Sequence, residues 1–175
     1  GSGISSAVGI ALAERMLAEK FNKPGHTIVD HHTYVFLGDG CMMEGVSHEA
    51  CSLAGVWKLG KLLALSDFNG ISIDGKTDGW LSEDGHDEKQ LDQALAAARA
   101  NTEKPSLIIC KTHIGYGTCR ADSAKVHGSP LGAEAAAEAK KTLGWTEPPF
   151  VIPQDIYDAW DARRAGAEAE SKWQA

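Results

Sequence analysis

One stretch decides the fold: Gly38-Asp39-Gly40-Cys41-Met42-Met43-Glu44-Gly45-Val46-Ser47-His48-Glu49-Ala50. It begins where a short apolar run, Tyr34 to Leu37, ends abruptly at a glycine, which is typical of a buried strand. It leads into a helical pattern from Val46 to Leu59, and Gly60 stands in the position expected just after that helix. A buried strand that passes through a glycine turn into a helix indicates the first part of a βαβ unit.

Similar elements lie on both sides of this stretch. An amphipathic helix is predicted over 4–21, a second strand over 62–65, a helix over 88–100 capped by Asp87, and a third strand over 106–111. Residues 115–132 have the pattern of a long loop, and the tail from Pro153 is helical. We therefore expect an α/β fold in three layers, with a mainly parallel sheet flanked by helices. Residues 1–146 would form the domain, and 147–175 a helical linker.

Composition and charge exclude several classes of function. The 175 residues carry a formal charge of −7, which gives no electrostatic footprint for nucleic acid or an anionic membrane. No apolar run is long enough to span a membrane and no signal peptide is visible, so we expect a cytoplasmic protein. The four cysteines are irregularly spaced and should be free thiols. A small-molecule substrate or a protein partner fits this composition best.

Oxygen-bearing side chains follow two of the predicted strands. Asp39 follows the first strand, and Asn69 follows the second, in the sequence Asp67-Phe68-Asn69-Gly70. The carboxyl ends of neighbouring parallel strands meet at one edge of a sheet, where such folds bind ligands. Asp39 and Asn69, helped by a backbone carbonyl such as that of Ile71, could hold Mg²⁺ or Ca²⁺. A glycine-flanked aspartate alone is more typical of an ordinary turn, so the hypothesis rests on the pair of residues at this spacing.

Nearly the whole chain closely resembles the transketolase family, whose enzymes use thiamine diphosphate. The resemblance rests on the stretch from Gly38 to Ala50 and on further segments spread along the chain: Gly3-Ile4-Ser5, Phe21-Asn22-Lys23-Pro24-Gly25-His26, Asn69-Gly70-Ile71-Ser72-Ile73-Asp74-Gly75, Lys104-Pro105-Ser106-Leu107 and His127-Gly128-Ser129-Pro130-Leu131-Gly132. It implies the thiamine-diphosphate-binding fold. In the family's pattern Asp39, Asn69 and the Ile71 backbone are metal ligands, and Gly40 and Asn69 contact the cofactor.

The resemblance also implies a reaction and its partners. A histidine at the position of His127 lies beside cofactor and substrate, where it can donate a hydrogen bond or a proton. Glu44 matches an acid at the subunit interface, in a relay between paired active sites. The implied reaction transfers a two-carbon ketol unit between sugar phosphates, in the pentose phosphate pathway, with the cofactor supplying the covalent chemistry. The implied partner is a second copy of the chain, or a complementary pyrimidine-binding subunit.

The chain departs from the family's pattern in several places. An upstream segment with two further histidines, a pyrimidine-binding domain and a C-terminal domain are not found in these residues, so we expect catalysis to need them. Trp80 to Asp84 runs directly into Gly85, where the family has a helix and a strand between. The loop from Thr118 to Val126 and Phe68 also differ. These departures leave open an alternative function, a non-catalytic or degenerate module that binds the cofactor or a partner.

Overall fold

The computed structural model describes residues 1–72, 75–76 and 83–174. The contacts divide the chain into two compact units, Gly1–Leu131 and Gly132–Ala175. These units are defined by contacts alone. The expected division into a binding domain, 1–146, and a linker, 147–175, stays a prediction. Trp80, in the junction that departs from the family pattern, lies outside the described residues.

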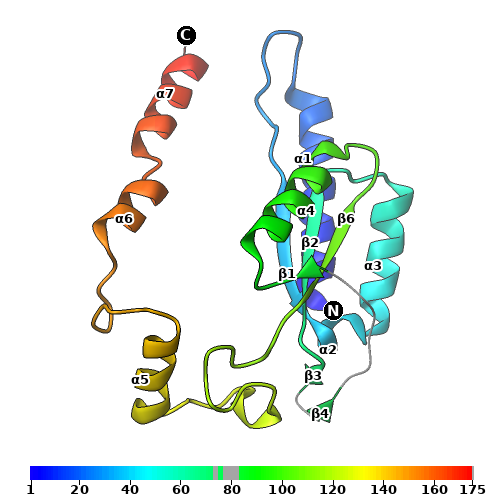
Figure 1. Ribbon diagram of the computed structural model, residues 1–175. Helices are drawn as coiled ribbons and strands as arrows, with labels where there is room; N and C mark the ends of the chain where they lie inside the picture. The colour runs from blue at the N-terminus through cyan, green and yellow to red at the C-terminus, as the bar shows by residue number, and fades with distance from the viewer. Residues whose placement is uncertain (73–74, 77–82, 175) are drawn as a thin grey trace. The chain divides into compact units, whose positions relative to one another are not determined.

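A parallel sheet forms the centre of the first unit (Figure 1). Its strands lie in the order β1 (Thr33–Gly38), β2 (Leu62–Phe68), β6 (Ser106–Lys111) and β5 (Glu83–Asp84), and every neighbouring pair is parallel. The predicted parallel sheet is confirmed, although β2 continues three residues beyond its expected end. A small antiparallel hairpin, β3 (Ile71–Ser72) and β4 (Gly75–Lys76), follows β2.

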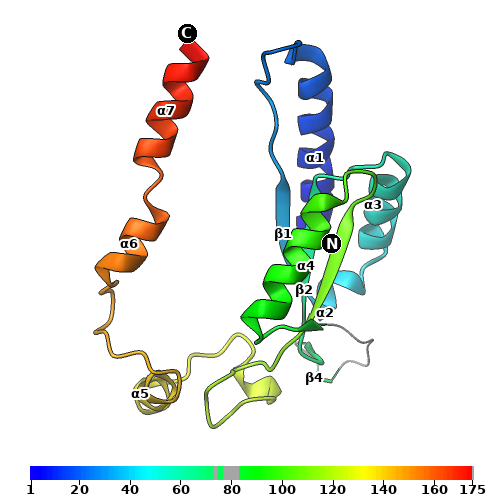
Figure 2. The same ribbon diagram turned by 45° about the horizontal axis from the view of Figure 1, so that its top comes forward.

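Helices cover both faces of this sheet, as the three-layer prediction requires (Figures 1 and 2). On one face α1 (Ser2–Phe21) and α3 (Gly45–Val56) pack together over β2. Small side chains let the helices approach closely there, among them Ala7, Ala11, Ala50 and Ala54. On the other face, α4 (Glu88–Ala100) covers a second cluster around Leu63 and Ile108. Leu63 is fully buried between the layers.

Of the two helix ends predicted in this unit, one is confirmed and one is wrong. The N-cap at Asp87 is confirmed, because its carboxylate accepts hydrogen bonds from the backbone of Lys89 and Gln90. The predicted glycine stop at Gly60 is wrong, since α3 ends at Val56 and Lys58 adopts the left-handed conformation instead, with φ of 52°. Gly60 serves a close approach: a Cβ there would lie 2.0 Å from the carbonyl oxygen of Thr102.

The sheet remains continuous where the chain is shortened relative to the family, because β5 still pairs with β6. β5 is only two residues long and pairs with Cys110 and Lys111 at the end of β6. Gly85 follows at once, in a tight space where a Cβ would come within 2.5 Å of the Thr112 methyl group. The connection from β5 to β6 then runs through α4, so this parallel pair keeps a full crossover helix.

The described residues of the second unit, 132–174, form three helices, α5 (Ala133–Thr142), α6 (Gln154–Trp160) and α7 (Arg163–Gln174). The helical tail is confirmed. The sequence interpretation missed α5, although its alanine and glutamate content is typical of a helix. Within the described part of the chain, no helix is long and apolar enough to cross a membrane. Cys41, Cys51, Cys110 and Cys119 all lie in the described part of the chain and form no disulfide with one another, as expected.

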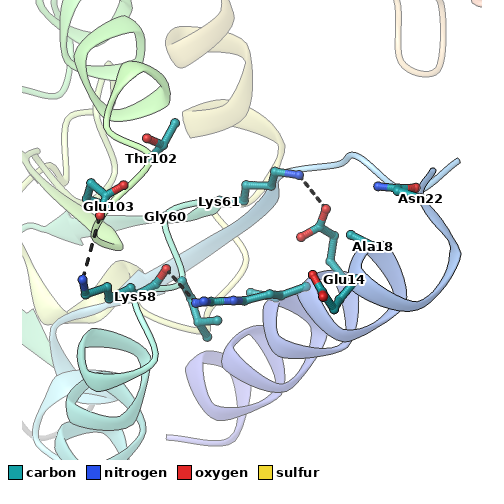
Figure 3. Close-up of a pocket in the computed structure, with 12 residues that line it drawn as sticks. Glu14, Ala18, Asn22, Lys58, Gly60, Lys61, Thr102 and Glu103 are labelled. Atoms are coloured by element: carbon teal, nitrogen blue, oxygen red, sulfur yellow. Dashed lines mark hydrogen bonds and ion pairs between the residues drawn. The ribbon is translucent and has the colours of Figure 1, made fainter. Parts of the chain in front are cut away.

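An ion-pair cluster ties α1 to the amino end of β2 (Figure 3). The Lys61 Nζ lies 2.6 Å from Glu14 Oε1 and 2.6 Å from Asp30 Oδ1. The Glu14 side chain is only 4% exposed, so its carboxylate depends on this partner. Burial alone would lower the pKa of Lys61, but the hydrogen bonds to Asp30 and Glu14 outweigh it and raise that pKa. The hydrogen bond from Lys61 also lowers the pKa of Asp30.

We expect Lys61→Met to lower the free energy of unfolding by about 2 kcal/mol, because it leaves Glu14 buried without its cation. The control, Asp30→Asn, removes an exposed partner and should cost less than about 0.5 kcal/mol. Urea unfolding at neutral pH measures both values. Equal losses of unfolding free energy in the two variants would contradict the claim that buried Glu14 depends on Lys61.

The ion pair between Lys61 and Asp30 should also make the stability of the fold depend on pH. Since the pKa of Asp30 is lowered in the folded state, its contribution is present above about pH 4 and lost as the pH falls further. Since the pKa of Lys61 is raised, its contribution is present below about pH 10 and lost as the pH rises further. Thermal unfolding of Lys61→Met should show smaller losses of stability at both extremes of pH than the unsubstituted chain, and equal losses in the two proteins would contradict this role of the pair.

Candidate functional site

The candidate site is built where β1 and β2 end. The two strands are in register, with Gly38 opposite Asp67, so the residues that follow them lie at the same edge of the sheet. Asp39 is 8% exposed, and its Oδ2 accepts a 2.9 Å hydrogen bond from the backbone N–H of Gly70. The structure therefore brings Asp39 against the turn that contains Asn69, as the strand arrangement predicted.

Glycine makes this turn possible. Gly70 has a φ of 71°, in the left-handed region that side chains other than glycine seldom adopt. That conformation turns the backbone N–H of Gly70 toward Asp39 and leads directly into β3, which begins at Ile71. The Asn69 side chain donates from Nδ2 to Asp67 Oδ2 over 3.3 Å. Ile71 comes directly after Gly70, so its backbone carbonyl belongs to the same turn as Asn69.

Gly40 lies in α2 (Asp39–Met42), which starts immediately after β1. A Cβ on Gly40 would meet no atom within 4 Å, so open space adjoins the backbone there. Helix α2 has only four residues, and the twelve-residue α3 begins at Gly45. A helix that short has a small dipole. The dipole of α2 would therefore contribute little to attracting a diphosphate to this edge.

Glu44 and His127 lie in other segments. Glu44 precedes α3 at its N-cap position and is exposed. His127 directly follows a short 3₁₀ turn, η1 (Ala124–Val126), and is exposed. It belongs to the loop after β6, a different loop from the one that holds Asn69. Its place beside a cofactor stays a prediction.

The sequence interpretation missed polar groups that follow β6 at the same edge. The Thr112 backbone N–H donates to the Phe68 carbonyl over 2.9 Å, and its hydroxyl donates to Asp67 Oδ1. The signal was available: the strand predicted over 106–111 ends just before Thr112, so the rule that placed Asn69 at this edge also applied to Thr112. The sequence interpretation gave Asp67 no role of its own.

A second missed group surrounds His113. Its Nδ1 lies 2.9 Å and 3.0 Å from the two carboxylate oxygens of Asp122, whose backbone φ is 60°. The backbone N–H of His113 donates to His86 Nε2 over 3.0 Å, and the His86 ring stacks on Tyr116 with 3.9 Å between centroids. These contacts fasten the loop that leads to His127 onto the end of β6.

The donor set at the end of β1 and β2 fits a hard divalent cation. Among the described residues, no group of three or more His, Cys, Asp or Glu side chains could hold a metal ion. One buried carboxylate, one side-chain amide and a backbone carbonyl offer oxygen atoms, which Mg²⁺ and Ca²⁺ prefer. Three such donors leave coordination positions for the oxygens of a diphosphate, and the open space at Gly40 leaves room for one.

The structure also has a cavity of about 590 Å³ at the opposite edge of the sheet (Figure 3). It lies beside Leu59, Gly60 and Lys61, which precede β2. Its charged groups serve the fold: Lys61 pairs with Glu14, Lys58 approaches Glu103 at 4.0 Å, and the Arg15 guanidinium donates to backbone carbonyls. This cavity is therefore separate from the oxygen-bearing edge and offers it no residue.

Comparison with known proteins agrees with this geometry. A family model described as transketolase, thiamine diphosphate binding domain, matches residues 1–175. Transketolase 2 of Escherichia coli is 51% identical over 191 residues, covering 99% of this chain and 29% of that protein. That alignment is longer than the 175-residue chain, so the relative has internal residues that this chain lacks.

Solved structures give the same result. A transketolase from Leishmania mexicana superimposes with a TM-score of 0.90 at 40% identity, covering 99% of this chain and 29% of that one. A Pichia stipitis transketolase in complex with sedoheptulose 7-phosphate gives a TM-score of 0.88 at 38% identity, with the same coverage. The chain thus spans about 29% of the length of these relatives. It belongs to the transketolase family and corresponds to the family's thiamine diphosphate binding domain.

Proposed function

We propose that this chain binds the diphosphate of thiamine diphosphate through Mg²⁺ or Ca²⁺, and that it serves two-carbon ketol transfer between sugar phosphates as part of a larger assembly. The observation that carries the proposal is the 2.9 Å hydrogen bond between Asp39 and the backbone of Gly70. It joins the ends of two parallel strands in a chain that matches a thiamine diphosphate binding domain.

Three oxygen donors would hold the cation in this proposal: the Asp39 carboxylate, the Asn69 side-chain oxygen and the Ile71 carbonyl. Asp39 is the charged member, and its burial behind β1 leaves it little exposed to solvent. Gly40 would let the backbone approach the diphosphate, because no Cβ occupies that space. When bound, thiamine diphosphate supplies the covalent chemistry of ketol transfer.

His127 would act on the substrate side. Its ring is exposed at the end of the loop after β6, where it can present an N–H donor to a substrate oxygen. A Pichia stipitis relative holds sedoheptulose 7-phosphate, a sugar phosphate, which supports this substrate class here. Glu44 is exposed beside α3, as a residue that faces a second subunit would be. The proposal includes a cytoplasmic homodimer or paired subunit in the pentose phosphate pathway.

A second candidate function is a module that binds the cofactor but turns nothing over. The observation that favours it is the reduced sheet edge, where β5 pairs with only two residues of β6 and the aligned relative has additional internal residues. Binding and turnover must therefore be measured separately.

For binding, we expect thiamine diphosphate to titrate into the folded chain with magnesium and not with EDTA. Asp39→Asn should weaken this binding by more than about tenfold, because it removes the charged metal ligand. Asp92→Asn changes the same charge on the exposed surface of α4 and should leave the affinity unchanged. Isothermal titration calorimetry measures all three proteins. Equal affinity with and without metal would refute the proposed site.

For turnover, we expect ketol transfer from xylulose 5-phosphate to ribose 5-phosphate only when a pyrimidine-binding domain is supplied. His127→Ala should lower kcat/KM by about a hundredfold while thiamine diphosphate affinity changes little, since the ring acts on the substrate. His26→Ala, in the turn after α1, is the control and should leave kcat/KM as it was. Binding without turnover by the supplemented, unsubstituted chain would favour the non-catalytic module.

A further inference from the structure

We propose that Asp67 is a positioning residue which, held by Thr112, orients the Asn69 side chain toward the divalent cation. The inference rests on the proposed function and adds two residues that do not themselves bind the metal. Asp67 lies at the end of β2 and Thr112 directly after β6, so two neighbouring strands supply the arrangement.

The orientation of the Asn69 amide decides whether it can bind a cation. Only Oδ1 can be a metal ligand, because the Nδ2 group carries two protons and is a donor. The two ends of the amide have nearly the same shape, so packing alone distinguishes them poorly. The donation from Asn69 Nδ2 to Asp67 Oδ2, over 3.3 Å, distinguishes them chemically. It turns the nitrogen toward Asp67, and the oxygen then points away from that carboxylate.

Asp67 needs support of its own to do this. It is exposed, and an exposed carboxylate with one long hydrogen bond would rotate among several conformers. The Thr112 hydroxyl donates to the other oxygen, Oδ1, so the two oxygens have different partners and the carboxylate plane is fixed. Thr112 is itself fixed, because its backbone N–H donates to the Phe68 carbonyl over 2.9 Å.

The result is a continuous chain of hydrogen bonds from Thr112 through Asp67 to Asn69. On the other side of Asn69, the backbone of Gly70 is held by Asp39. The turn between β2 and β3 is therefore held both at its backbone, by Asp39, and at the Asn69 side chain, by Asp67. Partners that orient metal ligands in this way typically change metal affinity by about 10- to 100-fold when they are removed.

Asp67 could also act simply through its negative charge, which would attract any cation to this edge. The two explanations differ in what Thr112 does. Thr112→Val removes the hydroxyl that holds Asp67 and leaves every charge in place. Thr118→Val is the matched control, since its hydroxyl donates to the Gly115 carbonyl over 2.7 Å elsewhere after β6.

The experiment titrates thiamine diphosphate with Mn²⁺ into four proteins, the unsubstituted chain, Asp67→Asn, Thr112→Val and Thr118→Val, by calorimetry. Asp67→Asn should lose at least about tenfold in affinity and Thr112→Val about three- to tenfold, in both low and high salt. Thr118→Val should bind as the unsubstituted chain does. Thermal unfolding checks that all four proteins are folded.

A second readout needs no cofactor. In nuclear magnetic resonance spectra of the chain labelled with ¹⁵N, the Asn69 side-chain amide protons should exchange with solvent faster in Thr112→Val than in Thr118→Val. The inference is overturned if Thr112→Val matches the unsubstituted chain in both affinity and exchange, or if the loss in Asp67→Asn disappears at high salt. Absence of metal-dependent binding in the unsubstituted chain would instead sink the proposed function, and the inference with it.

Discussion

The arrangement of the site depends on one hydrogen bond, from the backbone N–H of Gly70 to the Asp39 carboxylate. A buried carboxylate is costly unless polar partners compensate it, so its presence behind β1 constrains the neighbouring turn. The left-handed conformation of Gly70 is what lets the turn meet that demand. This bond links the residue that follows β1 to the turn that follows β2, and Asn69 and Ile71 flank Gly70 in that same turn.

The two edges of the parallel sheet carry different kinds of polar group. At the amino edge, oppositely charged side chains such as Lys61 and Glu14 pair with one another and fasten α1 to β2. At the carboxyl edge, Asp39, Asp67 and Asn69 present oxygens that hydrogen bonds hold in place. Parallel strands bring their carboxyl ends to one side, and that explains why ligand-binding groups can gather there without disturbing the packed core.

Much of this could be predicted from sequence because the rules are local. Strand-ending glycines and apolar periodicity place the sheet and its helices, and parallel pairing places Asp39 near Asn69. The Gly60 prediction failed because a close approach to Thr102, distant in sequence, required the glycine. The strand-end rule could have placed Thr112 at this edge as well, but its hydrogen bond to Asp67 depends on a contact between β2 and β6 that no local pattern specifies. The position of His127 relative to the metal ligands depends on a long loop without periodicity, so sequence rules do not set it.

The central claim is that the ends of β1 and β2 together hold one divalent cation that binds the diphosphate. A crystal structure of the chain with thiamine diphosphate and Mn²⁺, with anomalous scattering to locate the metal, tests this most directly. The account predicts one manganese peak coordinated by the Asp39 carboxylate, the Asn69 side-chain oxygen, the Ile71 carbonyl and diphosphate oxygens. Manganese bound away from Asp39, or a diphosphate with no metal between it and these residues, would contradict it.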